Sequence, residues 1–183
     1  ALMLLTSCAP SATTDVILMI KTEKELIIEF TDKNSEVLIE IAKFIHSNPE
    51  LGNQEFLSGK ALGSFLKKHN FTVTHNIAGH ETGFTARKVS SKPGPKIAFL
   101  AEYDALPEIG HGCGHNLIGT ASAGAAAAIG NIIESLGGEV VVFGTPAEEG
   151  GDNGSAKASF VNEGLFDNID AALMFHPANK NSV

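Results

Sequence analysis

The chain has 183 residues, with 13 Lys and Arg against 21 Asp and Glu, so its formal net charge is −8. Hydrophobic residues make up 43% of it, which indicates one globular domain or a large part of one and excludes disordered, collagenous and coiled-coil chains. The acidic balance argues against a nucleic-acid partner, because phosphate binding needs clustered Lys and Arg, and two cysteines cannot form a disulfide framework.

Residues 1–18 read differently from the rest of the chain. Two apolar runs are separated there by a polar stretch, and neither approaches the roughly 18 residues of a membrane span. We expect this segment to be a leader or upstream sequence outside the fold, with Met19 as the start and a cytoplasmic location. Leu5-Thr6-Ser7-Cys8 is also typical of a bacterial lipoprotein cleavage box, so anchoring through Cys8 is the alternative.

Hydrophobic periodicity predicts alternating helices and strands. The predicted helices cover residues 35–45 with Ser35 as cap, 54–70, 117–136 and 155–162. The predicted strands cover residues 71–77, 82–88, 97–101, 140–143 and 170–175, and the last three are apolar enough to be buried. This order predicts an α/β fold, an open mixed and largely parallel sheet with helices on both faces.

Each of these three apolar strands runs into a polar cluster. The clusters are 102–104 continuing to 111–116, then 145–152, then His176-Pro177. Ligands of such sheets bind beyond the carboxyl ends of the strands, so we expect carboxylates, a thiol and imidazoles to converge there. Taken singly, each cluster also has a structural interpretation: a buried Cys near an ordinary His, a solvated acidic turn, and a structural histidine.

Together the clusters indicate a metal site. Cys113 and His115 lie two residues apart between glycines, and a thiolate and an imidazole are good ligands for zinc and similar metals. Glu148 and Glu149 carry like charges at a strand end, which is costly without a cation. A metal would bind one carboxylate and leave the other free to take a proton from water.

Three motifs make a family resemblance specific. They are Leu100-Ala-Glu-Tyr-Asp-Ala-Leu-Pro107, Gly110-His-Gly-Cys-Gly-His-Asn-Leu117 and Gly144-Thr-Pro-Ala-Glu-Glu-Gly-Gly151. They resemble the dinuclear metallo-aminoacylase and carboxypeptidase family, peptidase family M20. Within it they are most similar to the amidohydrolase branch that contains aminobenzoyl-glutamate hydrolase and related dipeptidases. The segments 46–52 and 175–177 match as well, so the resemblance extends over residues 19–183.

The resemblance implies a role for each matching residue. Glu148 matches the general acid/base that activates a metal-bound water, and Asp104 matches an aspartate behind the site that supports the ligands. The matching metal ligands are Cys113, His115, Glu149 and His176. Carboxypeptidase-type members have a histidine ligand where this chain has Glu102, whose role the sequence leaves open. His111 receives no ligand role.

The resemblance also implies the function. We expect a metal-dependent hydrolase with two divalent ions, zinc or manganese, that cleaves the amide bond of small N-acyl amino acids or dipeptides. The alternative is a metal- or ligand-binding protein of the same fold without catalysis. Residues 19–183 correspond to the N-terminal part of a zinc-exopeptidase-like catalytic domain. The family's lid and dimerisation domain and the C-terminal part are not in this sequence, so the chain alone is expected to lack part of the site, and the full-length protein is expected to be a homodimer.

Overall fold

The computed structural model describes residues 21–151 and 153–180. The predicted leader, its boundary at residue 18 and Cys8 lie outside these residues. Within them, no helix combines the length and apolar character needed to cross a membrane. The elements in chain order are α1 (Glu23–Ser47), α2 (Phe56–Lys68), β1 (Thr72–Ile77), β2 (His80–Val89), β3 (Lys96–Ala101), α3 (His115–Asn131), α4 (Ile133–Leu136), β4 (Glu139–Gly144), α5 (Ala156–Asn162) and β5 (Ala171–Leu173).

The five strands form one mixed sheet in the order β1-β2-β4-β3-β5. β1 pairs with β2, and β2 with β4, in antiparallel fashion, whereas β3 lies parallel to both β4 and β5. The parallel part therefore consists of the three strands whose carboxyl ends carry the polar clusters. The predicted α/β class with a mixed sheet is confirmed.

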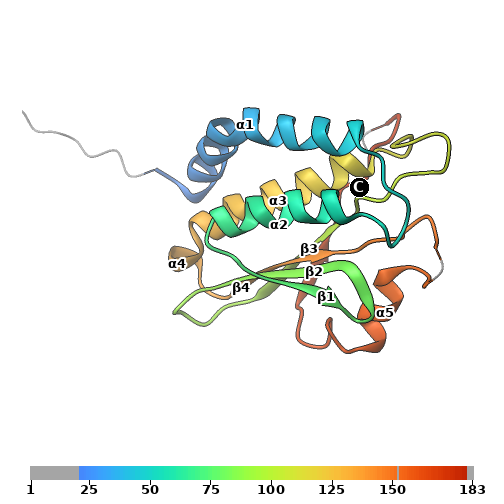
Figure 1. Ribbon diagram of the computed structural model, residues 1–183. Coiled ribbons are helices and arrows are strands. Elements are labelled where there is room, and N and C mark those ends of the chain that lie inside the picture. Colours follow the sequence, from blue (N-terminus) through green and yellow to red (C-terminus); the bar gives the residue numbers. More distant parts are fainter. Residues whose placement is uncertain (1–20, 152, 181–183) are drawn as a thin grey trace, which may run out of the picture.

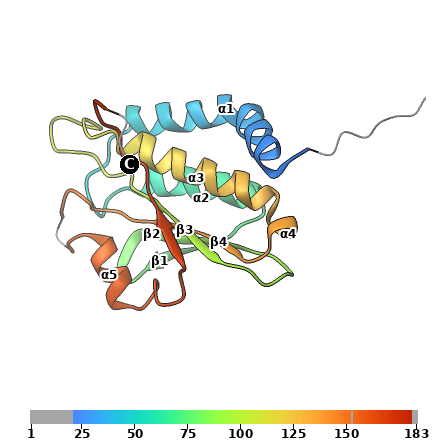
Figure 2. The same ribbon diagram turned by 180° about the vertical axis from the view of Figure 1, so that it is seen from behind.

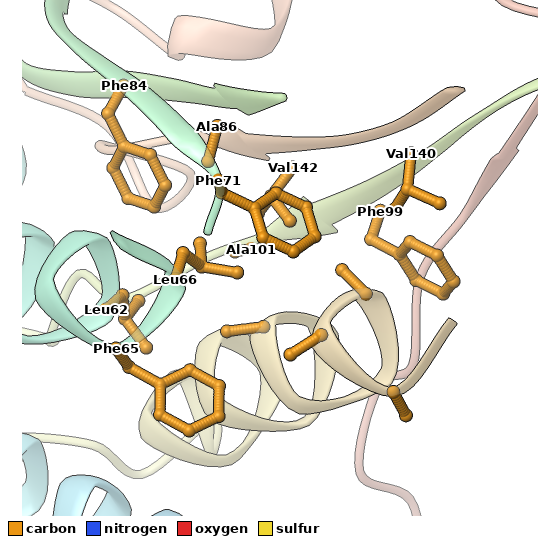
Figure 3. Close-up of a cluster of buried hydrophobic side chains, with 14 of the residues drawn as sticks. Leu62, Phe65, Leu66, Phe71, Phe84, Ala86, Phe99, Ala101, Val140 and Val142 are labelled. Atoms are coloured by element: carbon orange, nitrogen blue, oxygen red, sulfur yellow. The ribbon is translucent and has the colours of Figure 1, made fainter. Parts of the chain in front are cut away.

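Helices cover both faces of this sheet, as predicted. α2 and α3 pack on one face with α1 lying over α3, and α5 lies on the other face (Figures 1 and 2). The larger core fills the space between the sheet and α3, where small alanines of the helix face the phenylalanines and valines of the strands (Figure 3). A smaller apolar cluster beneath α5 is centred on Phe143 and Phe160.

Close packing fixes α3 against the end of β3. Gly119 lies on the buried side of this helix, and a Cβ there would come within 2.6 Å of the Glu102 carbonyl oxygen and 3.0 Å of Leu62. A glycine at this position lets the first turns of α3 approach the β3 carboxyl end, where the polar residues begin. The helix N-terminus is thereby held beside the strand that precedes it in the sequence.

The first helix is longer than predicted. It begins at Glu23, and Thr22 is its N-cap, with a capping box in which the Thr22 side chain accepts from the Glu25 amide and the Glu25 carboxylate accepts from the Thr22 amide. Ser35 lies inside the helix, where its hydroxyl donates to the Asp32 carbonyl, so its prediction as a cap is wrong. The predicted helix over 117–136 is likewise divided into α3 and α4, with Ile132 between them.

The prediction that the last apolar strand is buried is also wrong. β5 is a three-residue edge strand that pairs only with β3 in the described part of the chain, and all three of its residues are exposed. The exposed fractions of Leu173, Met174 and Phe175 are 50%, 43% and 52%. An apolar sequence allows a strand to be buried, but the strand is buried only where other elements pack against it.

Candidate metal centre

The carboxyl ends of β3, β4 and β5 lie at the same end of the sheet, and the N-terminus of α3 adjoins them (Figures 1 and 2). Gly114 caps α3 with φ +81°, a conformation that favours glycine, and a Cβ there would come within 2.8 Å of Pro177. This turn brings the segment after β5 close to the start of the helix. The structure brings together all six site residues predicted from the sequence, Asp104, Cys113, His115, Glu148, Glu149 and His176.

Asp104 supports the site from behind. Its Oδ1 lies 2.9 Å from His115 Nδ1, and its backbone oxygen lies 3.0 Å from the same nitrogen. Its Oδ2 accepts a hydrogen bond of 2.9 Å from the Glu149 amide. One buried carboxylate thus orients an imidazole on α3 and the loop after β4 at the same time. With Nδ1 protonated toward Asp104, Nε2 presents its lone pair to the opposite side.

His115 Nε2 faces a group of carboxylates. Glu102 Oε2 lies 3.5 Å away, and oxygens of Glu148 and Glu149 lie 3.9 Å away. Burial lowers the pKa of His115, but the hydrogen bond and charge of Asp104, together with the nearby glutamates, outweigh it and raise the pKa. Nε2 is buried without a hydrogen-bond partner among the described residues, as is Glu102 Oε2. A shared cation would satisfy both atoms, so the residues present fit a metal ion.

In the described part of the chain, two sets of three donors have ligand atoms within 4.8 Å of one another. They are Glu102, His115 and His176, and Cys113, His115 and Glu149. His176 Nδ1 lies 2.9 Å from the Pro177 carbonyl oxygen, so Nδ1 donates there and Nε2 is available. Sulfur, nitrogen and oxygen donors in this mixture suit zinc, and the carboxylates and imidazoles also suit manganese.

The surroundings of Cys113 disfavour its thiolate form. Its hydrogen bond to Glu149 and its burial, followed by the charges of Glu149, Glu148 and Asp104, raise its pKa to about 11. In this surrounding the thiolate does not form at neutral pH by itself. A divalent ion would reverse the local field and deprotonate the sulfur.

The two adjacent glutamates differ in their surroundings. Both are about one-third exposed, which leaves them accessible from the open side of the site. Glu148 Oε1 lies 3.6 Å from the Lys157 ammonium group, whereas the Glu149 amide is held by Asp104. A cavity of about 350 Å³ opens beside Glu149 and has the size of a small-molecule site. It is lined by Leu51, Gln54, Ala105, Pro107, Glu149 and Gly150.

A buried carboxylate just before the second helix holds the backbone that leads to Glu148. Glu55 Oε1 accepts from the Ala147 amide at 2.9 Å, and its Oε2 accepts from the Thr82 hydroxyl at 2.8 Å. Ala147 has φ +57°, an uncommon conformation for a residue with a Cβ. Burial raises the pKa of Glu55, although these hydrogen bonds oppose the shift. Sequence reasoning missed this residue, because an acid near the start of a helix is usually exposed.

Removing this carboxylate should destabilise the fold. We expect Glu55→Ala to lower the free energy of unfolding by about 2–4 kcal/mol, because it leaves a buried amide and a buried hydroxyl without acceptors. Urea denaturation followed by circular dichroism measures the change. Glu81→Ala, on the exposed side of β2, is the matched control and should change stability by less than about 0.5 kcal/mol. An equal loss of unfolding free energy in the two variants would contradict the role of Glu55 as a buried hydrogen-bond acceptor.

A sheet with helices on both faces and a cluster of possible metal-ligand donors beyond its parallel strands is typical of α/β domains that bind ligands at the carboxyl ends of the strands. Comparison with known proteins agrees: residues 98–182 match the sequence model of peptidase family M20/M25/M40. The resemblance to this family seen in the motifs is thereby confirmed.

Three similar proteins illustrate the relationship. A p-aminobenzoyl-glutamate hydrolase from Escherichia coli is 42% identical over 75% of this chain and 32% of its own length. Human Xaa-Arg dipeptidase is 35% identical over 88% of this chain and 41% of its own. A Bacillus subtilis structure, described as a dinuclear metal-binding peptidase of the M20 family, has a TM-score of 0.64 and 24% identity, covering 82% of this chain and 43% of that one. This last likeness shows the fold. The chain therefore spans less than half the length of these relatives.

Proposed function

We propose that this chain provides a metal-binding and proton-transfer site for hydrolysis of the amide bond in small N-acyl amino acids or dipeptides. The observation that carries the proposal is the pair of glutamates after β4. Glu149 belongs to a set of metal-ligand donors, whereas its neighbour Glu148 belongs to neither set and has one carboxylate oxygen 3.9 Å from His115 Nε2 and the other 3.6 Å from the Lys157 ammonium group. A purely structural metal site has no need of such a second carboxylate.

In this proposal, metal binding and proton transfer are assigned to different residues. Bound zinc or manganese would polarise the carbonyl of the scissile amide and make water more acidic. Cys113, His115, Glu149 and His176 would hold two such ions, and Asp104 fixes the orientation of His115. Glu148 would accept a proton from the attacking water and later donate it to the leaving amine. The cavity beside Glu149 would receive part of the substrate.

The names of the relatives support the substrate class. p-Aminobenzoyl-glutamate hydrolase and Xaa-Arg dipeptidase are both named for compounds in which an amide bond links a small acyl or aminoacyl group to an amino acid. Such substrates share the scissile bond and differ in its two flanking groups. We therefore propose the bond type and the size class of the substrate, with the flanking groups left to experiment.

A substrate panel tests this proposal. The protein, as this chain and as the longest natural polypeptide that contains it, is loaded with zinc or manganese and incubated with N-acyl amino acids, p-aminobenzoyl-glutamate and dipeptides. Released amino acid is measured by mass spectrometry. The proposal expects metal-dependent cleavage of at least one group of compounds, abolished by a chelator. A longest polypeptide that binds metal stoichiometrically but cleaves none of them would contradict hydrolysis and favour a binding protein.

A further inference from the structure

The two carboxylate oxygens of Glu102 have different surroundings. Glu102 is the first residue after β3 and is 1% exposed. Its Oε1 accepts from the Lys157 ammonium group, which reaches in from α5. Its Oε2 is buried and has no hydrogen-bond partner among the described residues. An ionised oxygen buried in this way is costly unless something positive lies against it.

The unpaired oxygen faces an unpaired nitrogen. Glu102 Oε2 lies 3.5 Å from His115 Nε2, which also has no hydrogen-bond partner in the described part of the chain. In the neutral imidazole, the form that binds metals, the proton lies on Nδ1 at the Asp104 side and Nε2 offers a lone pair, so the two facing atoms are then both acceptors. Two ligands of one tetrahedral zinc ion, each about 2.1 Å from the metal, are themselves about 3.4 Å apart. The observed separation matches that geometry, and His176 supplies a third donor within 4.8 Å.

Lys157 explains how this carboxylate is held in place. By engaging Oε1 it neutralises part of the buried charge and leaves Oε2 directed toward His115. Carboxylates that ligate metals are commonly hydrogen-bonded through such outer contacts. The same ammonium group lies 3.6 Å from Glu148 Oε1, so it contacts two of the three glutamates that face His115.

We propose that Glu102 is a metal ligand through Oε2, which forms one of the two metal positions with His115 and His176, and that Lys157 is the residue that positions it. The inference rests on the metal site of the proposed function and adds a ligand that the sequence motifs left without a role.

Metal binding by the chain tests the proposal directly. The 183-residue chain is titrated with Co²⁺ and followed by visible absorption, and its zinc affinity is measured by competition with a chromophoric chelator. Glu102→Gln should lower the zinc affinity at least about tenfold and alter the Co²⁺ absorption bands, because a ligand oxygen is lost. Lys157→Met should weaken binding in the same direction, and Lys157→Arg should bind more tightly than Lys157→Met. Glu163→Gln, an exposed residue at the end of α5, is the matched control and should behave as the wild type.

The outcomes distinguish a failure of the Glu102 assignment from a failure of the proposed function. If Cys113→Ala loses metal while folded Glu102→Gln keeps the wild-type affinity and spectrum, the role of Glu102 is wrong and the metal site stands. If neither the wild-type chain nor the longest natural polypeptide that contains it binds Co²⁺ or zinc, both proposals are contradicted. Should Glu102→Gln fail to fold, Glu102→Asp keeps the charge but withdraws the oxygen. Weaker binding by that variant supports the assignment, and wild-type binding overturns it.

Discussion

Replacing His115 with alanine should remove metal binding from this chain. His115 is the only residue shared by the two sets of donors found in the described residues, and its Nε2 faces Glu102, Glu148 and Glu149. We expect the zinc affinity of His115→Ala to fall more than about 100-fold, because loss of a ligand exceeds the roughly 10–100-fold cost of losing a ligand's support. Elemental analysis after dialysis and chelator competition measure the effect.

A graded series makes this result specific. Asp104→Asn keeps His115 but weakens the hydrogen bond that fixes its orientation, so it should lower the affinity by about 10–100-fold. His75→Ala removes an exposed histidine on β1, at the opposite edge of the sheet from β5, and should change nothing. Wild-type affinity in folded His115→Ala would show that the donors at this end of the sheet do not form the metal site.

The sequence predicted where chemistry would lie because the relevant signals are local. Short apolar runs followed closely by Glu102, Glu148 or His176 are visible without a structure, and strand–helix alternation brings such ends together. The start of α1 was harder to predict from the sequence. Its buried side is sparse, with Phe30, Ala42 and Ile45 as its buried residues, so the amphipathic pattern of its first turns is weak.

The features that could not be predicted depend on contacts between residues that are far apart in the chain. The Glu102–Lys157 pair joins residues 55 positions apart, and the contact between Glu55 and the Ala147 amide joins residues 92 apart. The residues around Glu102 and Glu55 in the sequence do not distinguish them from solvated glutamates. Tertiary packing decides that each is buried and which group it contacts. The exposure of β5 has the same origin, since an apolar strand is buried only where other elements cover it.

Glu148→Gln should separate catalysis from metal binding. The amide side chain keeps the size of the carboxylate but cannot accept a proton from water, so we expect kcat to fall by about 10²–10⁴-fold, the usual contribution of a general base. Its metal content should stay at the wild-type level, because Glu149, and not Glu148, belongs to the donor sets. Turnover of the best substrate and metal content are measured on the same preparations, in the longest natural polypeptide that contains this chain.

A substitution of the neighbouring Glu149 distinguishes a metal ligand from a proton-transfer residue. Glu149→Gln removes a donor next to Cys113 and His115, so metal content should fall and turnover should fall with it. A low rate that recovers when excess metal is supplied would then mark a ligand, and a low rate at full metal occupancy would mark the proton-transfer residue. Glu148→Gln with a near-normal rate would show that another group takes the proton, and the hydrolytic role assigned to this pair would have to be reversed or abandoned.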